Sequence, residues 1–177
     1  SKILGTTIAF MKLKDAGLLN LTDRIGDFLT LGEFNTVSNI TLAQLLTHEA
    51  GLTPFIPFYE RFNDSNFFNY FRTKPEENFT IEVAKDLFIR DDYKDTMWYE
   101  TTHRERKAIG SYKYSDLSMY ILQRVLEAKA GMSLDKYLYS QFYKPMDLEL
   151  CYNPTGKFKL ERIVPTEYDI KFRLQQL

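Results

Sequence analysis

Apolar residues recur at helical spacing along most of the chain. Between residues 116 and 129 they stand three or four positions apart, which places them on one side of a helix: Leu117, Ile121, Val125 and Ala128. Gly131 follows soon after, and glycine is typical just beyond a helix C-terminus because it readily adopts a left-handed backbone. The pattern predicts a strong helix over residues 116–129.

Residues 2–16 form a second segment with this spacing. Four apolar side chains fall on or near one face of the expected helix: Ile3, Leu4, Ile8 and Met11. Gly17 supplies the C-terminal stop. We expect a helix from about Lys2 to Ala16 with these residues on its apolar face.

The helix that begins after Thr41 has the clearest boundaries in the sequence. Thr41 and Gln44 are spaced as a capping box, in which the Thr41 hydroxyl accepts from the Gln44 amide and the Gln44 side chain reaches back. We expect this helix to run to about Glu49 and to end at Gly51.

The middle of the chain is less regular. Residues 52–79 carry prolines and many phenylalanines, which favours an irregular region with one short helix near residues 65–71. Residues 80–88 are expected to form a further helix. Residues 89–113 are polar and mixed, with a possible strand or loop at residues 96–101.

A last helix is expected over residues 134–142, capped by Ser133 and closed by Pro145. The tail, residues 152–177, contains proline and glycine and is expected to be extended. Strand patterns are scarce throughout the chain. The expected fold class is therefore mainly α (α+β overall), with at most a few strands.

Composition narrows the function classes. The chain has 177 residues and 44% hydrophobic residues, which is a globular composition with room for one domain and a sizeable core. A net charge of −1 gives no indication of nucleic acid binding. The sequence holds no apolar run of 18 residues, so we expect no membrane span.

Metal and disulfide sites are not expected either. Cys151 is the single cysteine, which excludes an internal disulfide framework and a cysteine-based metal site. His48 and His103 are far apart, and no cysteine or carboxylate cluster accompanies them. We expect no metal and no other cofactor, and His103 is expected in a solvated loop.

Three short motifs carry possible chemistry. Lys2 stands at the start of the first expected helix. Tyr114-Ser115-Asp116 lies directly before the strong helix. Between them, residues 40–52 contain a Leu-Leu-x-His-x-x-Gly-Leu pattern that includes His48. Taken singly, each has an ordinary structural explanation: a solvated lysine, a helix N-cap with a packed tyrosine, and a histidine at a helix end.

Taken together, the three motifs resemble the serine β-lactamase and penicillin-binding-protein superfamily, closest to its class C β-lactamase-like and esterase-like branch. The resemblance runs over nearly all of residues 1–177. It implies the helical portion of a β-lactamase/transpeptidase-like α/β domain with most of the sheet missing. Residues 1–177 are thus expected to be a single partial domain, truncated at both ends.

The resemblance also implies roles for the motif residues. In this family the nucleophilic serine lies three residues before the lysine, so a serine matching Lys2 would stand two residues before Ser1. Lys2 would act as the base, provided that burial and neighbours lower its pKa. Tyr114 would relay a proton, Asp116 would shape the site, and His48 would be structural, favoured as a positive charge at a helix C-terminus.

The implied function is part of a serine hydrolase that forms an acyl-enzyme with an ester, a D-amino-acid peptide or a β-lactam. The substrate would be a small molecule or peptidoglycan-like, and a periplasmic or secreted bacterial location is suggested. Residues 1–177 alone are expected to be inactive, because the serine and the third family motif, His/Lys-x-Gly, are missing. Surface left by missing strands could support self-association.

Two alternatives remain open at the level of sequence. The chain could be a non-catalytic binding or scaffold domain that retains the fold. It could also be a helical interaction module, for which the phenylalanine-rich residues 55–71 are the candidate surface, although packing under a loop or at the missing sheet is the favoured explanation for those residues.

Overall fold

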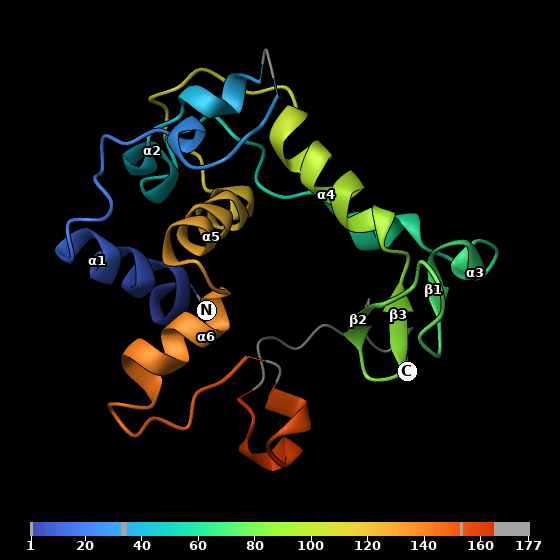
Figure 1. Ribbon diagram of the computed structural model, residues 1–177. Helices are drawn as coiled ribbons and strands as arrows, with labels where there is room; N and C mark the ends of the chain where they lie inside the picture. The colour runs from blue at the N-terminus through green and yellow to red at the C-terminus, as the bar shows by residue number, and fades with distance from the viewer. Residues whose placement is uncertain (1, 33–34, 153, 165–177) are drawn as a thin grey trace. The chain divides into compact units, whose positions relative to one another are not determined.

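The computed structural model describes residues 2–32, 35–152 and 154–164, and these form two compact units that meet in the sequence between Leu134 and Asp135. The helices of the first unit are mostly short (Figure 1). A π-helical turn, Ile3–Thr7, leads into the first of them, and the set is α1 (Ile8–Asp15), α2 (Leu42–Leu46), α3 (Phe67–Tyr70), α4 (Asp92–His103) and α5 (Asp116–Ala130). No helix within the described residues is both long and apolar enough to cross a membrane.

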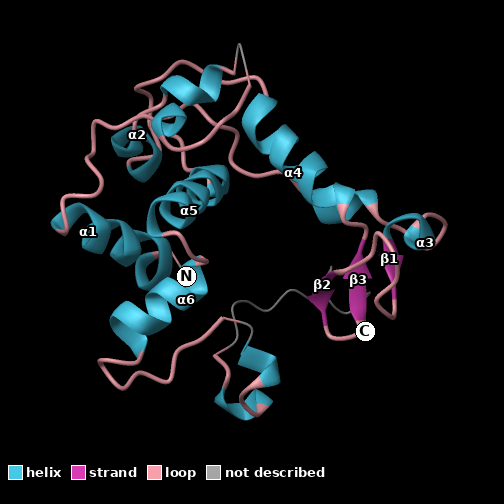
Figure 2. Cartoon of the chain, in the orientation of Figure 1, coloured by secondary structure: helices cyan, strands magenta, loops and turns pink. Residues whose placement is uncertain are grey.

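A small antiparallel sheet accompanies these helices (Figure 2). Its strands are β1 (Phe71–Arg72), β2 (Ile81–Ala84) and β3 (Leu87–Ile89), in the order β1-β3-β2. Ile89 pairs with Phe71 on one side and with Ile81 on the other. Mostly helical structure with a few strands confirms the expected fold class.

The helix expected over residues 80–88 is wrong, because this segment is the β2–β3 hairpin. Asp86 has a φ of 56°, a left-handed conformation that reverses the chain and interrupts helical hydrogen bonding. Ile81 and Val83 are β-branched residues in alternating positions, which favours a strand. The apolar residues of this segment thus follow the period of a strand and not that of a helix.

The possible strand at residues 96–101 is also wrong, since the segment lies inside α4. Threonine usually favours strands, but here its hydroxyls are satisfied within the helix. Thr101 donates to the Met97 carbonyl at 2.8 Å, and Thr102 donates to the Trp98 carbonyl at 3.0 Å. Asp92 in the first turn adds a favourable charge at the helix N-terminus.

The core of the first unit lies where α1 and α2 pack on α5. The stripe predicted for α5 is confirmed for three of its residues, since Leu117, Ile121 and Val125 are fully buried. Ala128, the fourth, is exposed. The left-handed Gly131, with a φ of 67°, ends the helix as predicted.

The apolar face predicted for the first helix is wrong, although the helix itself is confirmed. Ile3, Leu4 and Met11 are 75%, 54% and 56% exposed, whereas the buried side carries Ala9, Phe10 and Leu13. Both stripes have helical spacing, so the sequence pattern did not separate them. Ala9 leaves space for a close approach to α5, and that contact selects the second stripe.

The capping box at α2 is confirmed in both directions. The Thr41 hydroxyl accepts from the Gln44 amide at 3.3 Å, and the Gln44 side chain accepts from the Thr41 amide at 3.0 Å. The helix nevertheless ends at Leu46, earlier than the predicted Glu49. His48 has a φ of 58°, which is incompatible with a continuing helix.

The phenylalanine-rich segment packs at the small sheet. Phe71, Ile89 and Tyr93 form a buried cluster, and Phe62 lies against it with its ring 4.7 Å from that of Phe71. The short helix predicted near residues 65–71 is present as α3. Packing therefore accounts for much of this segment.

The second unit is smaller. The helix predicted over residues 134–142 is confirmed as α6 (Leu134–Leu138) followed by a π-helical turn, Tyr139–Tyr143. The tail expected to be extended instead carries 3-10 turns at Pro154–Gly156 and Leu160–Arg162. Its last part, residues 165–177, lies outside the described residues.

Replacing Gly51 by Ala should destabilise the first unit by about 3 kcal/mol or more. Gly51 has a φ of 70°, and an added Cβ would lie 2.2 Å from the Lys107 carbonyl oxygen. The matched control is Gly131→Ala, since Gly131 has a φ of 67° and open space around it, so that strain alone costs about 1–2 kcal/mol. Urea unfolding of both variants measures the difference, and equal losses would contradict this packing.

Candidate active site

The three side chains predicted from the motifs meet at one carboxylate oxygen. Lys2 Nζ lies 2.8 Å from Asp116 Oδ1, and the Tyr114 hydroxyl donates to the same oxygen at 2.9 Å. Lys2 Nζ also lies 5.0 Å from the centre of the Tyr114 ring, within the range of a cation–π contact. Residues far apart in the sequence thus form a compact polar cluster.

The start of α5 holds Tyr114 and Asp116 in place. The Ser115 hydroxyl donates to the Thr53 carbonyl at 2.6 Å, and the Asp116 amide donates to the Pro54 carbonyl at 2.7 Å. Ser115 makes no side-chain cap on α5. The Ser115 side chain therefore does not act as the helix N-cap that the sequence alone also allowed.

His48 supports the tripeptide from the other side. The Ser115 amide donates to His48 Nδ1 at 3.3 Å, and the His48 carbonyl accepts from the Lys113 amide at 2.9 Å. The rings of His48 and Tyr114 lie 4.8 Å apart. His48 therefore contacts both the Ser115 backbone and the Tyr114 side chain. These positioning contacts were not predicted from the sequence.

The charge state of His48 differs from the expected one. Burial lowers the pKa of His48, and the nearby Lys2 charge lowers it further, against a smaller opposing effect of Asp116. The neutral ring is the form that accepts at Nδ1. From the sequence we expected a positively charged histidine that interacts favourably with a helix C-terminus. That physical reason for a histidine at position 48 is therefore wrong.

Lys2 is held in its protonated form. The hydrogen bond with Asp116 raises the pKa of Lys2, the Tyr114 hydroxyl raises it further, and partial burial only partly offsets them. Burial favours protonated Asp116, but the hydrogen bonds from Lys2 and Tyr114 outweigh it and lower the pKa of Asp116. At neutral pH the site holds an ammonium beside a carboxylate, without the lowered lysine pKa that a resting base needs.

The Lys2–Asp116 pair makes a modest contribution to stability. Both side chains are 36% exposed, so solvent screens the pair and its contribution is about 0.2–1 kcal/mol. Because the pKa of Lys2 is raised, its contribution to stability is present below the usual lysine pKa and is lost as pH rises through the raised value. Because the pKa of Asp116 is lowered, its contribution to stability is lost as pH falls through that lowered value.

His103 lies apart from this cluster. It is exposed to solvent, as expected, but it is the last residue of α4 and not part of a loop, so that part of the expectation is wrong. Its ring stacks on Tyr99 with the centres 4.0 Å apart, and Nε2 lies 3.3 Å from Asn35 Nδ2. Among the described residues, no group of three histidine, cysteine or acidic side chains is arranged to hold a metal ion.

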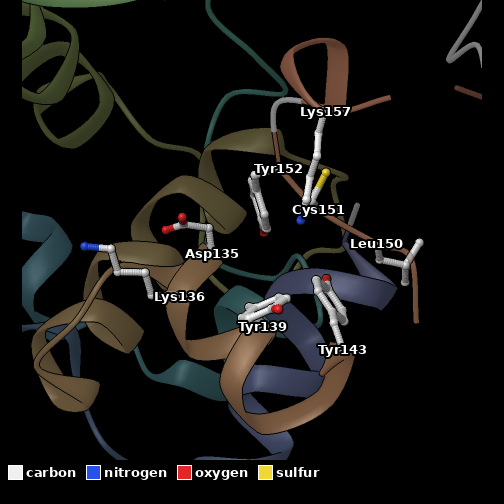
Figure 3. A pocket seen from close by; sticks show the side chains of 8 residues that line it. All are labelled: Asp135, Lys136, Tyr139, Tyr143, Leu150, Cys151, Tyr152 and Lys157. Atoms are coloured by element: carbon white, nitrogen blue, oxygen red, sulfur yellow. The ribbon is translucent and has the colours of Figure 1, made fainter. Parts of the chain in front are cut away.

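The second unit has its own hollow of about 250 Å³ around Cys151 (Figure 3). Tyr139, Tyr143 and Lys157 line it, and Lys157 Nζ lies 5.6 Å from the centre of the Tyr139 ring. None of the predicted site residues is part of this hollow. The chemistry implied by the motifs therefore belongs to the first unit.

Replacing Asp116 by Asn should lower the pKa of Lys2, because the substitution removes the largest of the interactions that raise it. Tyr114→Phe should lower the same pKa by less, since Tyr114 contributes the second-largest effect. An NMR pH titration that follows the Lys2 side chain measures both variants against the unaltered chain. An unchanged or higher Lys2 pKa in Asp116→Asn would show that the ion pair does not set the charge state.

The chain is similar in sequence to a protein of Escherichia coli. The chain is 26% identical over 178 residues to an Escherichia coli K12 protein named "Putative D-alanyl-D-alanine carboxypeptidase", a match that covers 94% of the chain and 36% of that protein. The chain thus spans about a third of the length of this curated relative.

Two solved structures share the fold. The octameric penicillin-binding protein homologue from Pyrococcus abyssi matches with a TM-score of 0.57 and 21% identity, over 87% of this chain and 32% of that one. A class C β-lactamase from Rhodobacter sphaeroides matches with a TM-score of 0.51 and 18% identity, over 88% and 36%. A family model described as Beta-lactamase matches residues 1–167, so the chain belongs to the Beta-lactamase family, as the motifs indicated.

Proposed function

We propose that residues 1–177 are the part of a serine hydrolase that supplies the proton-transfer residues for an acyl-enzyme reaction. The observation that carries this proposal is the meeting of Lys2 and Tyr114 at Asp116 Oδ1. Membership in the Beta-lactamase family supports the reaction class. The family spacing would place the nucleophilic serine three residues before Lys2, one helical turn away and on the same face.

The proposed reaction uses each group in turn. The serine hydroxyl attacks the carbonyl carbon of the substrate, and its proton passes to the Lys2 amine. The carbon–nitrogen or carbon–oxygen bond of the substrate then breaks, and the leaving group takes up a proton delivered through the Tyr114 hydroxyl. Water hydrolyses the resulting ester, which restores the serine. Asp116 holds the Lys2 amine and the Tyr114 hydroxyl in position throughout.

The raised pKa of Lys2 makes this reaction dependent on pH. Only the neutral amine accepts the serine proton, and the ion pair with Asp116 keeps that form rare at neutral pH. The acylation rate should therefore increase with pH through the neutral and mildly alkaline range. Ester, D-amino-acid peptide and β-lactam substrates all fit this mechanism, and the name of the E. coli relative favours a D-amino-acid peptide.

A second candidate function is a non-catalytic binding or scaffold domain. The observation that favours it is the Lys2 ammonium, which the Asp116 carboxylate holds in its charged form. In that case the cluster would stabilise the fold and transfer no proton. Self-association through uncovered apolar surface, to which exposed Ile3 and Met11 belong, is part of neither function and would be tested separately by sedimentation.

Residues 1–177 alone should show no covalent labelling by a serine-reactive fluorophosphonate, because the family spacing assigns the nucleophile to a position outside them. Mass spectrometry of the intact chain measures this directly. Stoichiometric labelling at Ser115, Ser118 or any other serine of this chain would overturn the assignment of Lys2.

In a longer chain that begins before Ser1 and carries the serine, Tyr114→Phe should lower the acylation rate by roughly 100-fold, a usual contribution of one acid–base group. Tyr112→Phe is the matched control, since its ring lies 6.2 Å from His48 and it makes no hydrogen bond to Asp116 among the described contacts.

In the pH range below the Lys2 pKa, the same longer chain should acylate roughly tenfold faster for each unit by which the pH rises, because the neutral amine increases in that proportion. Asp116→Asn should shift this rise to lower pH. Absence of acylation at every pH would favour the scaffold function. A rate that does not change with pH, together with full activity of Tyr114→Phe, would remove Lys2 and Tyr114 from the proposed mechanism.

A further inference from the structure

A hollow of about 270 Å³ lies in the first unit beside the segment that supports the candidate active site. Residues 51–53 line one side of it. The other side belongs to the connector between α4 and α5, residues 104–115, which Figure 1 shows in yellow. The lining side chains of the connector are Glu105, Arg106, Lys107 and Lys113. The Lys2–Tyr114–Asp116 cluster contributes no lining residue, so the hollow is separate from it.

Main-chain hydrogen bonds hold the two sides of this hollow together. The Lys107 amide donates to the Gly51 carbonyl at 2.9 Å, and the Lys113 amide donates to the His48 carbonyl at 2.9 Å. Gly51 has no side chain to keep the connector at a distance. The side chains that line the hollow are therefore carried by backbone that is fixed on both sides.

The lining of the hollow is basic. Arg106, Lys107 and Lys113 are cations and Glu105 is a carboxylate, which gives the lining a net charge of +2. Within the described parts of the chain, none of these four side chains has an ion-pair partner within 4.0 Å. Arg106 and Lys113 are also half-buried, so less water than usual surrounds their charges. The hollow thus holds positive charge that the described residues do not neutralise.

Two polar atoms at the hollow lack hydrogen-bond partners. Arg106 Nη2 donates to the Thr36 carbonyl at 2.8 Å, but Arg106 Nη1 is buried and makes no hydrogen bond with any described residue. Thr53 Oγ1 is buried and unpaired in the same sense. Buried polar atoms are nearly always paired in folded proteins, so an acceptor fits here. Both side chains line the hollow, and rotation of their end groups brings these donors to an occupant.

The protonation of Arg106 indicates the charge of the occupant. Burial lowers the pKa of Arg106, and no carboxylate of the described residues raises it. Arg61 is the contrasting case, because its hydrogen bond with Glu100 raises its pKa. An anion beside Arg106 would stabilise the charged guanidinium and offset the cost of its burial.

Size and charge indicate which anion fits. The hollow is slightly smaller than the usual site for a drug-sized molecule, so it suits a small ligand. A phosphate group carries a charge close to −2 and has several acceptor oxygens, which matches the net charge and the number of donors in the hollow. A guanidinium also binds two phosphate oxygens at once. A carboxylate has a single charge and two oxygens, so it would satisfy fewer of these donors.

We propose that this hollow binds a phosphate dianion, either free or as the terminal group of a small phosphomonoester. Arg106, Lys113 and the Thr53 hydroxyl would donate to its oxygens, while the exposed Lys107 adds positive charge at the rim. The Thr53 carbonyl accepts from the Ser115 hydroxyl at the start of α5, so an occupant would also stabilise that junction. This site does not depend on the proposed hydrolase function and is tested without it.

An NMR titration of the chain at neutral pH tests the binding. Sodium phosphate and sodium acetate are added separately, at an ionic strength kept constant with sodium chloride. Saturable shifts are expected at the amides of residues 51–53 and 105–107. Phosphate should bind roughly tenfold more tightly than acetate, because its second charge interacts with the same cations. Equal affinity for the two anions, or small shifts spread over the whole surface, would overturn the proposal.

Phenyl phosphate distinguishes the two sources of the phosphate group. Tighter binding of phenyl phosphate than of inorganic phosphate would assign the hollow to a phosphomonoester. Equal or weaker binding would assign it to free phosphate. Either result supports the site, provided that the shifts occur at residues 51–53 and 105–107.

The arginine is tested by Arg106→Gln, which should weaken phosphate binding roughly tenfold, since it removes a charged donor. The matched control is Arg104→Gln. It removes the same charge two residues away, from a side chain that lies 3.8 Å from Glu100 and does not line the hollow. The control should leave phosphate binding unchanged.

Lys113→Gln is the second variant, because Arg106→Gln also removes the hydrogen bond to the Thr36 carbonyl and with it a support of the connector. The Lys113 side chain has no ion pair to lose within the described residues, and its removal should weaken phosphate binding several-fold. If Arg106→Gln does not fold, Lys113→Gln decides. Phosphate binding as tight in the folded hollow variants as in Arg104→Gln would contradict the proposed site.

Discussion

The hydrogen bonds between residues 113–116 and residues 48–54 are the constraint on which the rest of the site depends. They fix the start of α5 through the Ser115 hydroxyl and the Asp116 amide, and they use backbone carbonyls that an open loop would leave to water. At this junction Asp116 contacts both Lys2 and the Tyr114 hydroxyl. Gly51 permits the junction because any side chain there would meet the Lys107 carbonyl.

The cluster at this junction is electrostatically balanced and not poised for reaction in its resting form. Asp116 accepts from both Lys2 and Tyr114, and its carboxylate keeps the lysine charged. An asparagine at position 116 would accept hydrogen bonds without a full negative charge. The aspartate at this position therefore raises the pKa of Lys2.

Sequence patterns predicted the helices with strong boundaries and the residues of the site. The α5 stripe, its glycine stop and the Thr41–Gln44 capping box follow from local rules that tertiary contacts did not override. The motif spacing indicated Lys2, Tyr114 and Asp116, and the fold brings them together. Their catalytic roles remain predictions, because contact alone does not move a proton.

Other features depended on contacts that a single sequence does not display. The β2–β3 hairpin depends on the left-handed Asp86, and the threonines of α4 are satisfied by carbonyls within the helix. The buried face of α1 was chosen by its approach to α5 and not by its own pattern. His48 gave a motif signal, but its bond to the Ser115 amide joins two segments that no local rule connects.

The most direct test of this account is native-state hydrogen exchange at the amides of Ser115 and Asp116. Both amides are hydrogen-bonded across the junction, to His48 Nδ1 and to the Pro54 carbonyl. We predict that they exchange about as slowly as the core amides of α5, through opening of the whole first unit. Exchange as fast as in an open loop would mean that the junction is not formed in solution, and the site built on it would have to be abandoned.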